Sequence, residues 1–491
     1  MSPPRHSRKQ GAPWPETAAV LHVGVFFALA TWGFGGNAEW VRPILTGWGC
    51  LGAILTAAVL MTRETRTRVS VRRLGWLAPL ALFNLLVLVS CLTPGLRMME
   101  IGGNAFYAPV DLSSWRPSAA LPAKACSALA LFDVIYISCF NLALIVHRRR
   151  TLRALLVFAG SNALVLAIFG TLQKLTHAEG LYFGLVKSPQ PYFFASFIYH
   201  NHWGAFAVLM TATCLGLVWY SGLRGRSPRG LLYTPAFGGL VAVLFIAATT
   251  PLSTSRSCTV LTLLLLAGAF VHWLTHLVRR RRQFNESMAA PLTSVLAAGV
   301  VAAAGIWFLA SETIRIRIAK TEEQVADIRA SGSVGRWILY RDTWRMAEDR
   351  IWFGWGMASY PKVFEFYNSQ SPGPVDHLPV TYRDAHNDWF QSVAEHGIFG
   401  TALLVLCGLV PLMGLIERPP RSPLPAYLLG GCGLVLLYAI LEFPFGNIAV
   451  VLTWWMCFFS AVRYSQLQHS GEGAAKEPAP QQAPSHPSAL L

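Results

Sequence analysis

The sequence predicts an all-α polytopic membrane protein, with about twelve transmembrane helices and a large, partly helical loop between the ninth and tenth. Two features of its composition predict this fold class: 54% of the 491 residues are hydrophobic, and only 13% are charged. A soluble domain carries about 25% charged residues. The third observation is that the apolar residues form many unbroken runs of about 18 residues or more, which is long enough for a helix to cross a bilayer. Such runs argue against a transmembrane β-barrel, whose strands alternate apolar and polar residues over about ten positions.

The apolar runs give the order of the predicted helices. The predicted spans cover residues 17–36, 44–61, 74–93, 127–147, 153–173, 202–222, 231–250, 258–278, 290–310, 397–416, 424–443 and 446–463. The first run lacks a small-residue cleavage site and is therefore interpreted as a helix, preceded by a short N-terminal segment, 1–16. The tail, 464–491, is rich in Pro, Ala, Gln and Ser without periodicity, which predicts disorder.

Basic residues predict the orientation, because short cytoplasmic loops of membrane proteins are enriched in Lys and Arg. Every second connection is basic, beginning with the N-terminal segment. The basic clusters contain Arg5, Arg8 and Lys9; Arg63, Arg66, Arg68, Arg72 and Arg73; Arg148, Arg149, Arg150 and Arg153; Arg224, Arg226 and Arg229; Arg279 to Arg282; and Arg418 and Arg421. Both termini are therefore expected in the cytoplasm, and the large loop, 311–396, on the extracytoplasmic side.

Charge and cysteine content exclude several function classes. The formal net charge is +16, but the basic residues lie beside apolar runs as orientation signals do, and no nucleic-acid-binding motif accompanies them. The nine cysteines are scattered without a CxxC pair, which predicts small buried apolar residues and no disulfide framework. The chain also lacks the glycine-rich phosphate-binding motifs of an ATP-driven pump.

Residues 331–400 concentrate arginines, aromatics and histidines between long apolar runs. Residues 313–330 predict a charged helix, and Ser333 is a candidate cap for a second helix that ends near Arg350. On this second helix Arg336, Tyr340 and Trp344 recur every four residues and so share one face. A neighbouring stripe contains Trp337, Arg341 and Arg345. The arginines make a transmembrane path unfavourable, and the aromatics favour the membrane surface.

Two arginines are candidates for binding an anion. Arg256 lies in PLSTSRSCTV, at the extracytoplasmic start of the eighth predicted span, and Arg336 lies at the start of the loop helix. A guanidinium binds phosphate in a bidentate manner and keeps its charge at any relevant pH. The alternative is that Arg256 anchors its helix at the membrane surface, as arginines at helix ends often do.

His386 is the candidate for acid–base chemistry. It opens HNDWFQSVAEHGIFG, in which Gly397 and Gly400 would permit close packing as the helix enters the membrane. Imidazole titrates near neutral pH and can act as a general base. Two further stretches face the same side: FIYHNHWGAF, with Asn201 and His202, and LEFPFGN, with Glu442, an ionisable residue close to lipid.

A metal site is an alternative for the same stretch. The possible ligands are Asp376, His377, Asp384, His386 and Asp388. Their spacing matches no zinc signature, and Pro379 interrupts the run.

These motifs together resemble the O-antigen ligase and polymerase family of bacterial membrane glycosyltransferases. The resemblance rests on Arg256 in STSRS, on Arg336, on WFGWGMASY at 352–360 and, most specifically, on the His-Asn motif followed by Gly-x-x-Gly. It extends over residues 153–463. One departure is Val260, which stands where the ligase arginine motif commonly has Leu.

The resemblance implies a GT-C-like architecture in the bacterial inner membrane with an active site facing the periplasm. The donor would be a glycan on undecaprenyl pyrophosphate, and the acceptor a hydroxyl of lipid A core or of a growing polysaccharide. Arg256 and Arg336 would hold the pyrophosphate, and His386 would activate the acceptor for attack with inversion, without a metal or another cofactor. The predicted substrate-binding residues are Arg256, Arg336, Arg341, Asn387, Asp388, Asn201 and His202.

A transporter or flippase for a lipid-linked glycan is the alternative from a different class. Such a protein typically shows internal repeats or paired broken helices near the membrane midplane. The sequence shows neither, and its polar residues gather on one face of the membrane. A one-sided site favours an enzyme.

Overall fold

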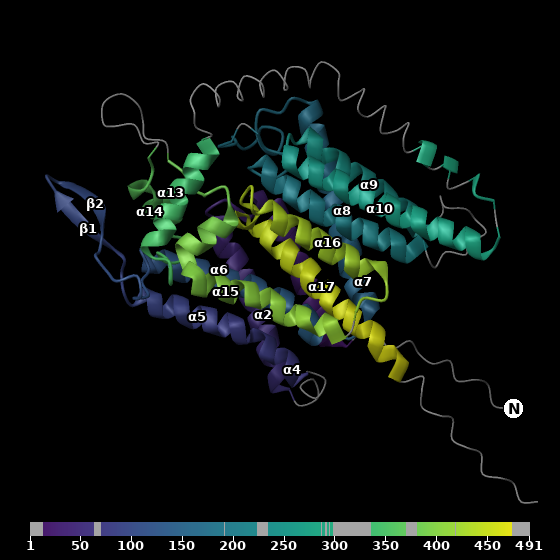
Figure 1. Ribbon diagram of the computed structural model, residues 1–491, viewed down its shortest axis with the longest axis horizontal. Coiled ribbons are helices and arrows are strands. Elements are labelled where there is room, and N and C mark those ends of the chain that lie inside the picture. The colour runs from purple at the N-terminus through teal and green to yellow at the C-terminus, as the bar shows by residue number, and fades with distance from the viewer. Residues whose placement is uncertain are drawn as a thin grey trace, which may run out of the picture.

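The computed structural model describes residues 13–62, 70–190, 192–222, 234–285, 287–289, 292–293, 295–297, 335–369, 381–417 and 419–473. Long apolar helices dominate these residues, as expected of a chain whose backbone polar groups must be satisfied within a bilayer. Ten of the helical segments in this part of the chain are long and apolar enough to cross a membrane. The protein is therefore a multi-pass membrane protein built mostly from helices (Figure 1).

The long helices follow the predicted order. They are α1 (Trp14–Trp32), α2 (Val41–Met61), α5 (Ala78–Cys91), α6 (Pro122–Ile145), α7 (Arg149–Leu175), α8 (His200–Gly222), α9 (Pro235–Leu252), α10 (Arg256–Gln283), α15 (Asp388–Glu417), α16 (Pro423–Tyr438) and α17 (Ile448–Gly473). The remaining helices are η1 (Phe34–Gly36), α4 (Val71–Leu74), η2 (Gly75–Leu77), α13 (Gly335–Asp349), α14 (Tyr360–Val363), η4 (Phe364–Phe366) and η5 (Pro444–Gly446).

The count of twelve predicted spans is not confirmed. One of the predicted spans corresponds to α16, an apolar helix shorter than the ten candidates. Another, 290–310, and the predicted charged helix, 313–330, lie almost entirely outside the described residues. The GT-C-like architecture stays a prediction.

The last helix is longer than its apolar run. α17 was expected to end near 463, but it continues to Gly473, into the segment predicted to be a disordered tail. The extension carries polar residues, and its first part still packs in the bundle, where Tyr464 and Ser465 are buried. Hydropathy marks where a helix leaves the apolar layer, whereas the helix itself ends later.

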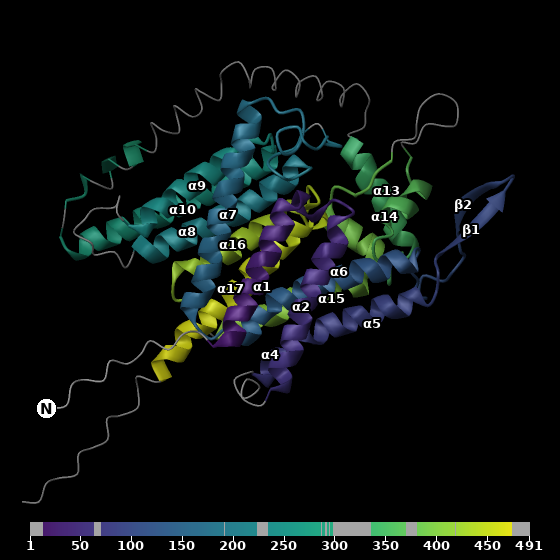
Figure 2. The ribbon, with the colours of Figure 1, turned by 180° about the vertical axis from the view of Figure 1, so that it is seen from behind.

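Helix α17 lies at the centre of the bundle. Its apolar residues pack against α6, α8 and α16, and almost all of its membrane-length stretch is buried (Figure 1). The reverse view shows α1, α2 and α6 covering the other side (Figure 2). Aromatic side chains fill the centre: the ring of Tyr136 lies 4.6 Å from that of Trp455, edge to face.

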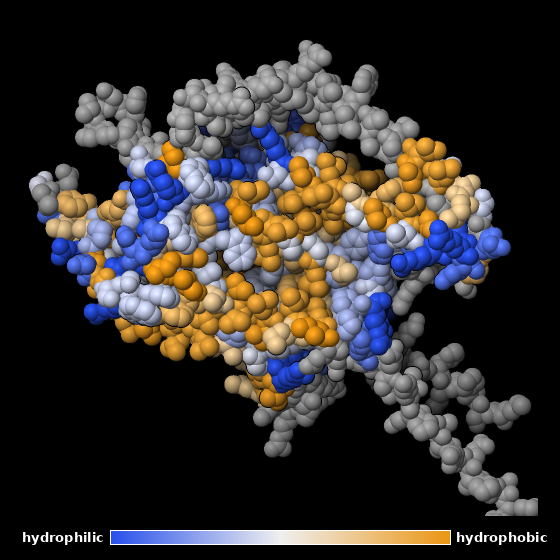
Figure 3. Space-filling view, viewed as in Figure 1, coloured by the Kyte–Doolittle hydropathy of each residue, from blue (hydrophilic) through white to orange (hydrophobic). Residues whose placement is uncertain are grey.

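The outer surface separates apolar from polar regions. Apolar residues cover the middle of the face seen in Figure 3, and polar residues gather over α13 at one end and over the last turns of α10 at the other. The last turn of α10 contains Arg280, Arg281 and Arg282, one of the predicted cytoplasmic clusters. This separation is the pattern expected for opposite membrane surfaces.

A small β-hairpin between α5 and α6 was missed by the sequence analysis. Strands β1 (Leu96–Ile101) and β2 (Asn104–Pro109) pair in an antiparallel register, with Ile101 opposite Asn104. Gly102 and Gly103 form the two-residue turn with φ of 62° and 79°, the left-handed conformation that such turns require. The hairpin projects from the helical body (Figure 1).

Helix α15 begins at Asp388, before the predicted start at 397, and breaks at Gly397, where φ is 65° and ψ −174°. The segment 351–356 lies against the break. The main-chain N–H groups of Ile398 and Phe399 donate to the carbonyls of Ile351 and Trp352, at 2.8 and 3.2 Å. In return the N–H groups of Trp355 and Gly356 donate to the carbonyls of Ala394 and Glu395, at 2.9 and 2.8 Å.

Glycine is required where these two backbones meet. A Cβ atom on Gly397 would lie 2.3 Å from the carbonyl carbon of Trp352, and one on Gly354 would lie 2.4 Å from that of Glu395. The close packing expected at Gly397 therefore exists, but its partner is the 351–356 segment and not the surroundings of His386.

Candidate functional site

Glu442 is the centre of a cluster of polar side chains at one end of the bundle. It follows α16 in the turn that leads to η5, and its side chain is only 3% exposed. Its Oε1 accepts hydrogen bonds from Nη2 of Arg336 at 2.5 Å and from Nδ2 of Asn201 at 3.1 Å. Its Oε2 lies 3.1 Å from Nδ1 of His386 and accepts from the hydroxyl of Tyr199 at 3.4 Å. One carboxylate thus joins three separate parts of the chain.

The turn that carries Glu442 is fixed by both neighbouring helices. The Glu442 N–H donates to the carbonyl of Tyr438, which extends the end of α16 by one turn. Pro444 then starts η5, where a missing N–H costs no helical hydrogen bond. The N–H of Phe445 donates to the carboxylate of Asp388, the first residue of α15, at 2.9 Å. The turn is therefore held beside the first residue of α15.

His386 has an unusual backbone conformation, with φ of 51°, in the left-handed region that residues other than glycine rarely adopt. Its carbonyl accepts a hydrogen bond from the hydroxyl of Tyr340 at 2.9 Å, and its ring packs edge to face against Phe443 at 4.7 Å. Such strain persists where surrounding contacts impose it, and it occurs often at functional sites. With Nδ1 directed at Glu442, Nε2 is the ring nitrogen left for another partner, and the side chain is 28% exposed.

Helix α13 supplies the predicted face of Arg336, Tyr340 and Trp344. Arg336 reaches Glu442, Tyr340 supports His386 one turn later, and Trp344 packs on Phe390 of α15 with ring centroids 5.7 Å apart. The periodicity seen in the sequence is thus the face of α13 that packs against α15. The guanidinium of Arg336 remains half exposed, with 51% of its side chain accessible, so it can bind a ligand while paired.

The start of α8 joins the cluster through Asn201. Its Nδ2 donates to Glu442 and to the hydroxyl of Tyr199, and its Oδ1 accepts from the hydroxyl of Ser255 at 2.7 Å. His202 is buried beside it, with Nε2 3.2 Å from the carbonyl of Phe443. Asn201 therefore lies within the cluster, whereas His202 lies behind it.

Arg256 is the first residue of α10 and directly follows Ser255. A chain of hydrogen bonds runs from Ser255 through Asn201 to Glu442 and so ties the start of α10 to the cluster. The Arg256 side chain is exposed, and among the described residues it has no hydrogen bond or ion pair. The structure thus brings the backbone of Arg256 to the same end of the bundle as Arg336 and His386.

Three other predicted residues have contacts within the protein. Asn387 caps α15, since its Oδ1 accepts from the N–H of Phe390 at 3.0 Å. Asp388 is bonded to the turn at Phe445. Arg341 lies on the neighbouring stripe of α13, where it donates to Asp342 and Ser369. None of the three contacts Glu442 through its side chain in the part of the chain that the structure describes.

The electrostatics of the cluster favour a charged Glu442. Burial acts to raise the pKa of its carboxyl group, but the hydrogen bond and charge of His386 and the charge of Arg336 outweigh burial. The pKa of Glu442 therefore lies below its ordinary value. For Tyr199 burial dominates, and together with the nearby Glu442 it raises the pKa of the hydroxyl well above its ordinary value, so that Tyr199 stays a neutral donor.

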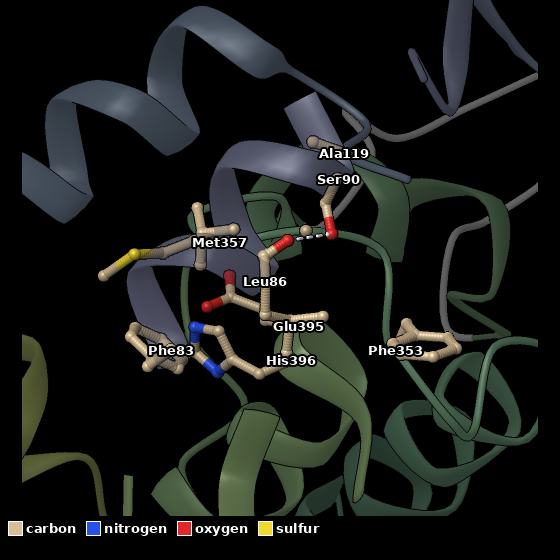
Figure 4. Close-up of a pocket in the computed structure, with 10 residues that line it drawn as sticks. Phe83, Leu86, Ser90, Ala119, Phe353, Met357, Glu395 and His396 are labelled. Atoms are coloured by element: carbon tan, nitrogen blue, oxygen red, sulfur yellow. Dashed lines mark hydrogen bonds between the residues drawn. The ribbon is translucent and has the colours of Figure 1, made fainter. Parts of the chain in front are cut away.

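A separate pocket lies under the 351–357 segment. Phe83 and Ser90 of α5, Met357, Glu395 and His396 line it, and none of the predicted site residues does (Figure 4). The Nε2 of His396 is buried without a hydrogen-bond partner in the described structure. This pocket is small and contains none of the predicted site residues, so the polar cluster around Glu442, which joins Arg336 and His386, is the better candidate site.

Several members of the cluster were not predicted as site residues. Glu442 was recognised as an ionisable residue near lipid but was not assigned to the site, and neither Tyr199 nor Tyr340 was assigned to it. The signal for Glu442 was its position at the end of an apolar run, where a charge needs partners. No group of three or more His, Cys, Asp or Glu that could hold a metal lies within the described residues, and Asp376 and His377 fall outside them.

Comparison with known proteins identifies part of the chain. The sequence model of the O-antigen ligase family matches residues 240–405, a narrower range than the predicted 153–463. A search of curated proteins found no match. The matched range contains Arg256, Arg336 and His386, and it implies a glycosyltransferase-type enzyme of the ligase or polymerase kind. The predicted resemblance is confirmed over residues 240–405, which match the O-antigen ligase family.

Proposed function

We propose that this protein transfers a glycan from undecaprenyl pyrophosphate to an acceptor hydroxyl, on lipid A core or a growing polysaccharide, at the periplasmic face of the inner membrane. The observation that supports this most directly is the shared carboxylate of Glu442, which holds both a cation, Arg336, and an imidazole, His386. A cation suits a leaving diphosphate, and an imidazole suits an attacking hydroxyl.

His386 is the proposed base. Glu442 accepts the Nδ1–H of the imidazole and so fixes the tautomer in which Nε2 carries a free lone pair. Nε2 removes the proton of the acceptor hydroxyl as its oxygen forms a bond to the anomeric carbon. The carboxylate then stabilises the imidazolium that results.

Arg336 and Arg256 are the proposed binding groups for the pyrophosphate. As the bond between the anomeric carbon and the phosphate oxygen breaks, the electron pair leaves with the oxygen, and negative charge grows on the diphosphate. Fixed cations stabilise this charge more in the transition state than in the ground state. Attack opposite to the leaving group inverts the configuration at the anomeric carbon. The two arginines supply the charge, so the proposed step uses no metal.

The orientation is part of the proposal. Basic residues mark the last turn of α10, whereas α13, which supplies Arg336 to the Glu442 cluster, lies at the other end of the bundle (Figure 1). The enrichment of Lys and Arg in cytoplasmic loops supports a periplasmic site and cytoplasmic termini. Lipid then surrounds the isoprenoid tail of the donor, while the half-exposed face of Arg336 is open to water.

The test is glycan transfer by His386→Ala in a strain that lacks the wild-type gene. Loss of a general base costs typically 10²- to 10⁴-fold, so long glycan chains should disappear while the variant stays in the membrane. His177→Ala is the matched control, because His177 has the same left-handed backbone conformation, with φ of 51°, but is exposed in the turn after α7. Transfer at the wild-type rate by His386→Ala would exclude the proposed base.

A further inference from the structure

The extracytoplasmic ends of α5 and α6 bring two cysteine side chains into contact. Cys91 is the last residue of α5, and Cys126 lies in the first turns of α6. Their sulfur atoms are 3.6 Å apart. All nine cysteines are described residues, and no other pair has a sulfur–sulfur contact of this kind.

The surroundings of the pair differ from those of the other cysteines. Six of the nine are buried, among them Cys139, Cys214 and Cys457 inside the helical bundle. Cys126 is exposed and Cys91 is partly buried, with its sulfur 3.7 Å from the carbonyl of Pro122. An exposed thiol in contact with a second thiol is accessible to an oxidising protein, whereas the thiols within the bundle are not.

Both thiols lie on the side predicted to be extracytoplasmic. The connection from α5 to α6 is on the same side of the membrane as the 351–356 segment, because Trp115 of this connection stacks on Trp352 with ring centroids 4.5 Å apart. Disulfides form and persist in the bacterial periplasm, and they are rare in the cytoplasm. The thiols therefore meet in a compartment that oxidises them.

We propose that Cys91 and Cys126 form a disulfide bond in the mature protein. The two thiols lose two protons and two electrons as the sulfur–sulfur bond forms. The electrons pass to the disulfide of a periplasmic thiol–disulfide oxidoreductase, which becomes a dithiol through a mixed-disulfide intermediate. A bonded pair is about 2.05 Å apart, so each sulfur must move by less than about 1 Å, which small side-chain rotations supply. This inference differs from the sequence-based prediction that the cysteines form no disulfide framework.

The bond would close the base of the connection that contains the β-hairpin. This connection also supports α13, because the buried Arg350 donates to Ser118 at 3.0 Å and to the carbonyl of Val110 at 2.9 Å. Cross-linking α5 to α6 reduces the conformational freedom of the connection in the unfolded chain. The bond therefore stabilises the folded connection that Arg350 contacts. The inference rests on the proposed orientation and is independent of the proposed glycosyl transfer.

Thiol counting on the full-length protein tests the bond. Membranes from aerobically grown cells are denatured in the presence of N-ethylmaleimide, then reduced, and the released thiols are labelled with a polyethylene-glycol maleimide. We expect two labels on the wild-type protein and none on Cys91→Ser or Cys126→Ser. Cys50→Ser is the matched control, because Cys50 is exposed but has no cysteine neighbour, and it should keep both labels.

A second variant tests the proposed membrane orientation separately from the proposed disulfide. Lys124→Cys, made with Cys91→Ser and Cys126→Ser, places a thiol at an exposed position beside the pair. A membrane-impermeant maleimide should label it in intact spheroplasts. If Lys124→Cys is labelled but the wild-type protein yields no reducible thiols, the disulfide is refuted while the orientation stands. If Lys124→Cys is not labelled, the orientation fails, and the disulfide and the proposed periplasmic site fail with it.

Discussion

Two helix ends present an arginine on the same side of the bundle, but the side-chain contacts of these two arginines differ. Arg336, near the start of α13, pairs with Glu442 at 2.5 Å and also donates to the carbonyl of Leu441 at 3.4 Å. Arg256, at the start of α10, has no such partner among the described residues, although Ser255 beside it is bonded to Asn201. The first guanidinium is positioned before any ligand binds, whereas for the second only the backbone is positioned.

This difference predicts that the two arginines contribute to different steps, one to the transition state and one to binding of the donor. A preorganised cation contributes to the transition state without the cost of ordering its side chain. A mobile one pays that cost when the ligand binds, and so contributes first to capture of the donor. The comparison therefore predicts that Arg336 acts mainly on kcat and Arg256 mainly on KM for the lipid-linked donor.

The largest effect is expected from Glu442→Ala, which removes the group that positions Arg336 and His386 together. Because both lose their common partner, transfer should fall by about 10³-fold or more, which exceeds the typical loss for one oriented donor. Glu442→Gln is the informative companion, because it keeps a carbonyl oxygen but removes the charge. Its transfer rate, measured with purified lipid-linked donor, should lie between those of the wild type and Glu442→Ala. Equal rates for all three proteins would exclude the proposed positioning role of Glu442.

Arg336→Ala and Arg256→Ala test the comparison directly. Removal of one preorganised charge-stabilising group costs about 10²- to 10³-fold. We expect that loss in kcat for Arg336→Ala, and for Arg256→Ala a higher KM with a smaller change in kcat. Arg345→Ala serves as control, since Arg345 lies on the other stripe of α13, beside Asp342. The same pattern of kinetic constants in both test variants would show that the two arginines do not differ in the way the structure suggests.

Gly397→Ala perturbs the contact between the 351–356 segment and the break in α15, and it touches neither arginine. The added Cβ meets the backbone of Trp352, and alanine is strained at φ of 65°. Strain of this kind costs about 1–3 kcal/mol, so thermal unfolding in detergent should begin at a lower temperature. Gly408→Ala, on the same helix, is the control, because no atom lies within 4 Å of its added Cβ. If the two variants unfold at the same temperature, the contact at Gly397 does not stabilise the folded protein.

The smallest effect concerns pH. Because the pKa of Glu442 in the folded protein lies below its ordinary value of 4.5, its stabilising contribution is complete above that pH and is lost as the pH falls through the lower folded value. Arg336 is half exposed, so solvent screens its share of this contribution. The difference in Tm between wild type and Glu442→Gln should therefore be modest at pH 7 and should shrink below pH 4.5. A difference that grew on acidification would contradict the ion pair.

The membrane helices could be predicted because hydropathy is a local property of the chain. Polar contacts over long sequence separations could not. Arg336 and His386 were found from their own stretches, yet the residue that joins them, Glu442, lies 106 positions beyond Arg336. No local pattern states that a carboxylate after one helix will meet an arginine at the start of another. A buried charge beside lipid indicates only that partners must exist.

Two further differences have a backbone origin. The hairpin at 96–109 is too short for its alternation to stand out beside strong apolar runs, although the Gly-Gly turn was visible. The start of α15 was placed at Gly397 because the apolar run begins there, whereas the helix begins at Asp388 and Gly397 is its break. Composition located the change in environment but not the change in backbone geometry.

The exchange of hydrogen bonds between 351–356 and the break in α15 also has a consequence for biogenesis. The ribosome completes 351–356 first, and in the proposed orientation this segment has to cross the membrane before α15 follows. Until the two meet, four main-chain groups at the break, the N–H groups of Ile398 and Phe399 and the carbonyls of Ala394 and Glu395, lack these partners. Unsatisfied backbone groups are costly near lipid. Binding of the 351–356 segment and packing of α15 into the bundle should therefore occur as one cooperative step, late in assembly.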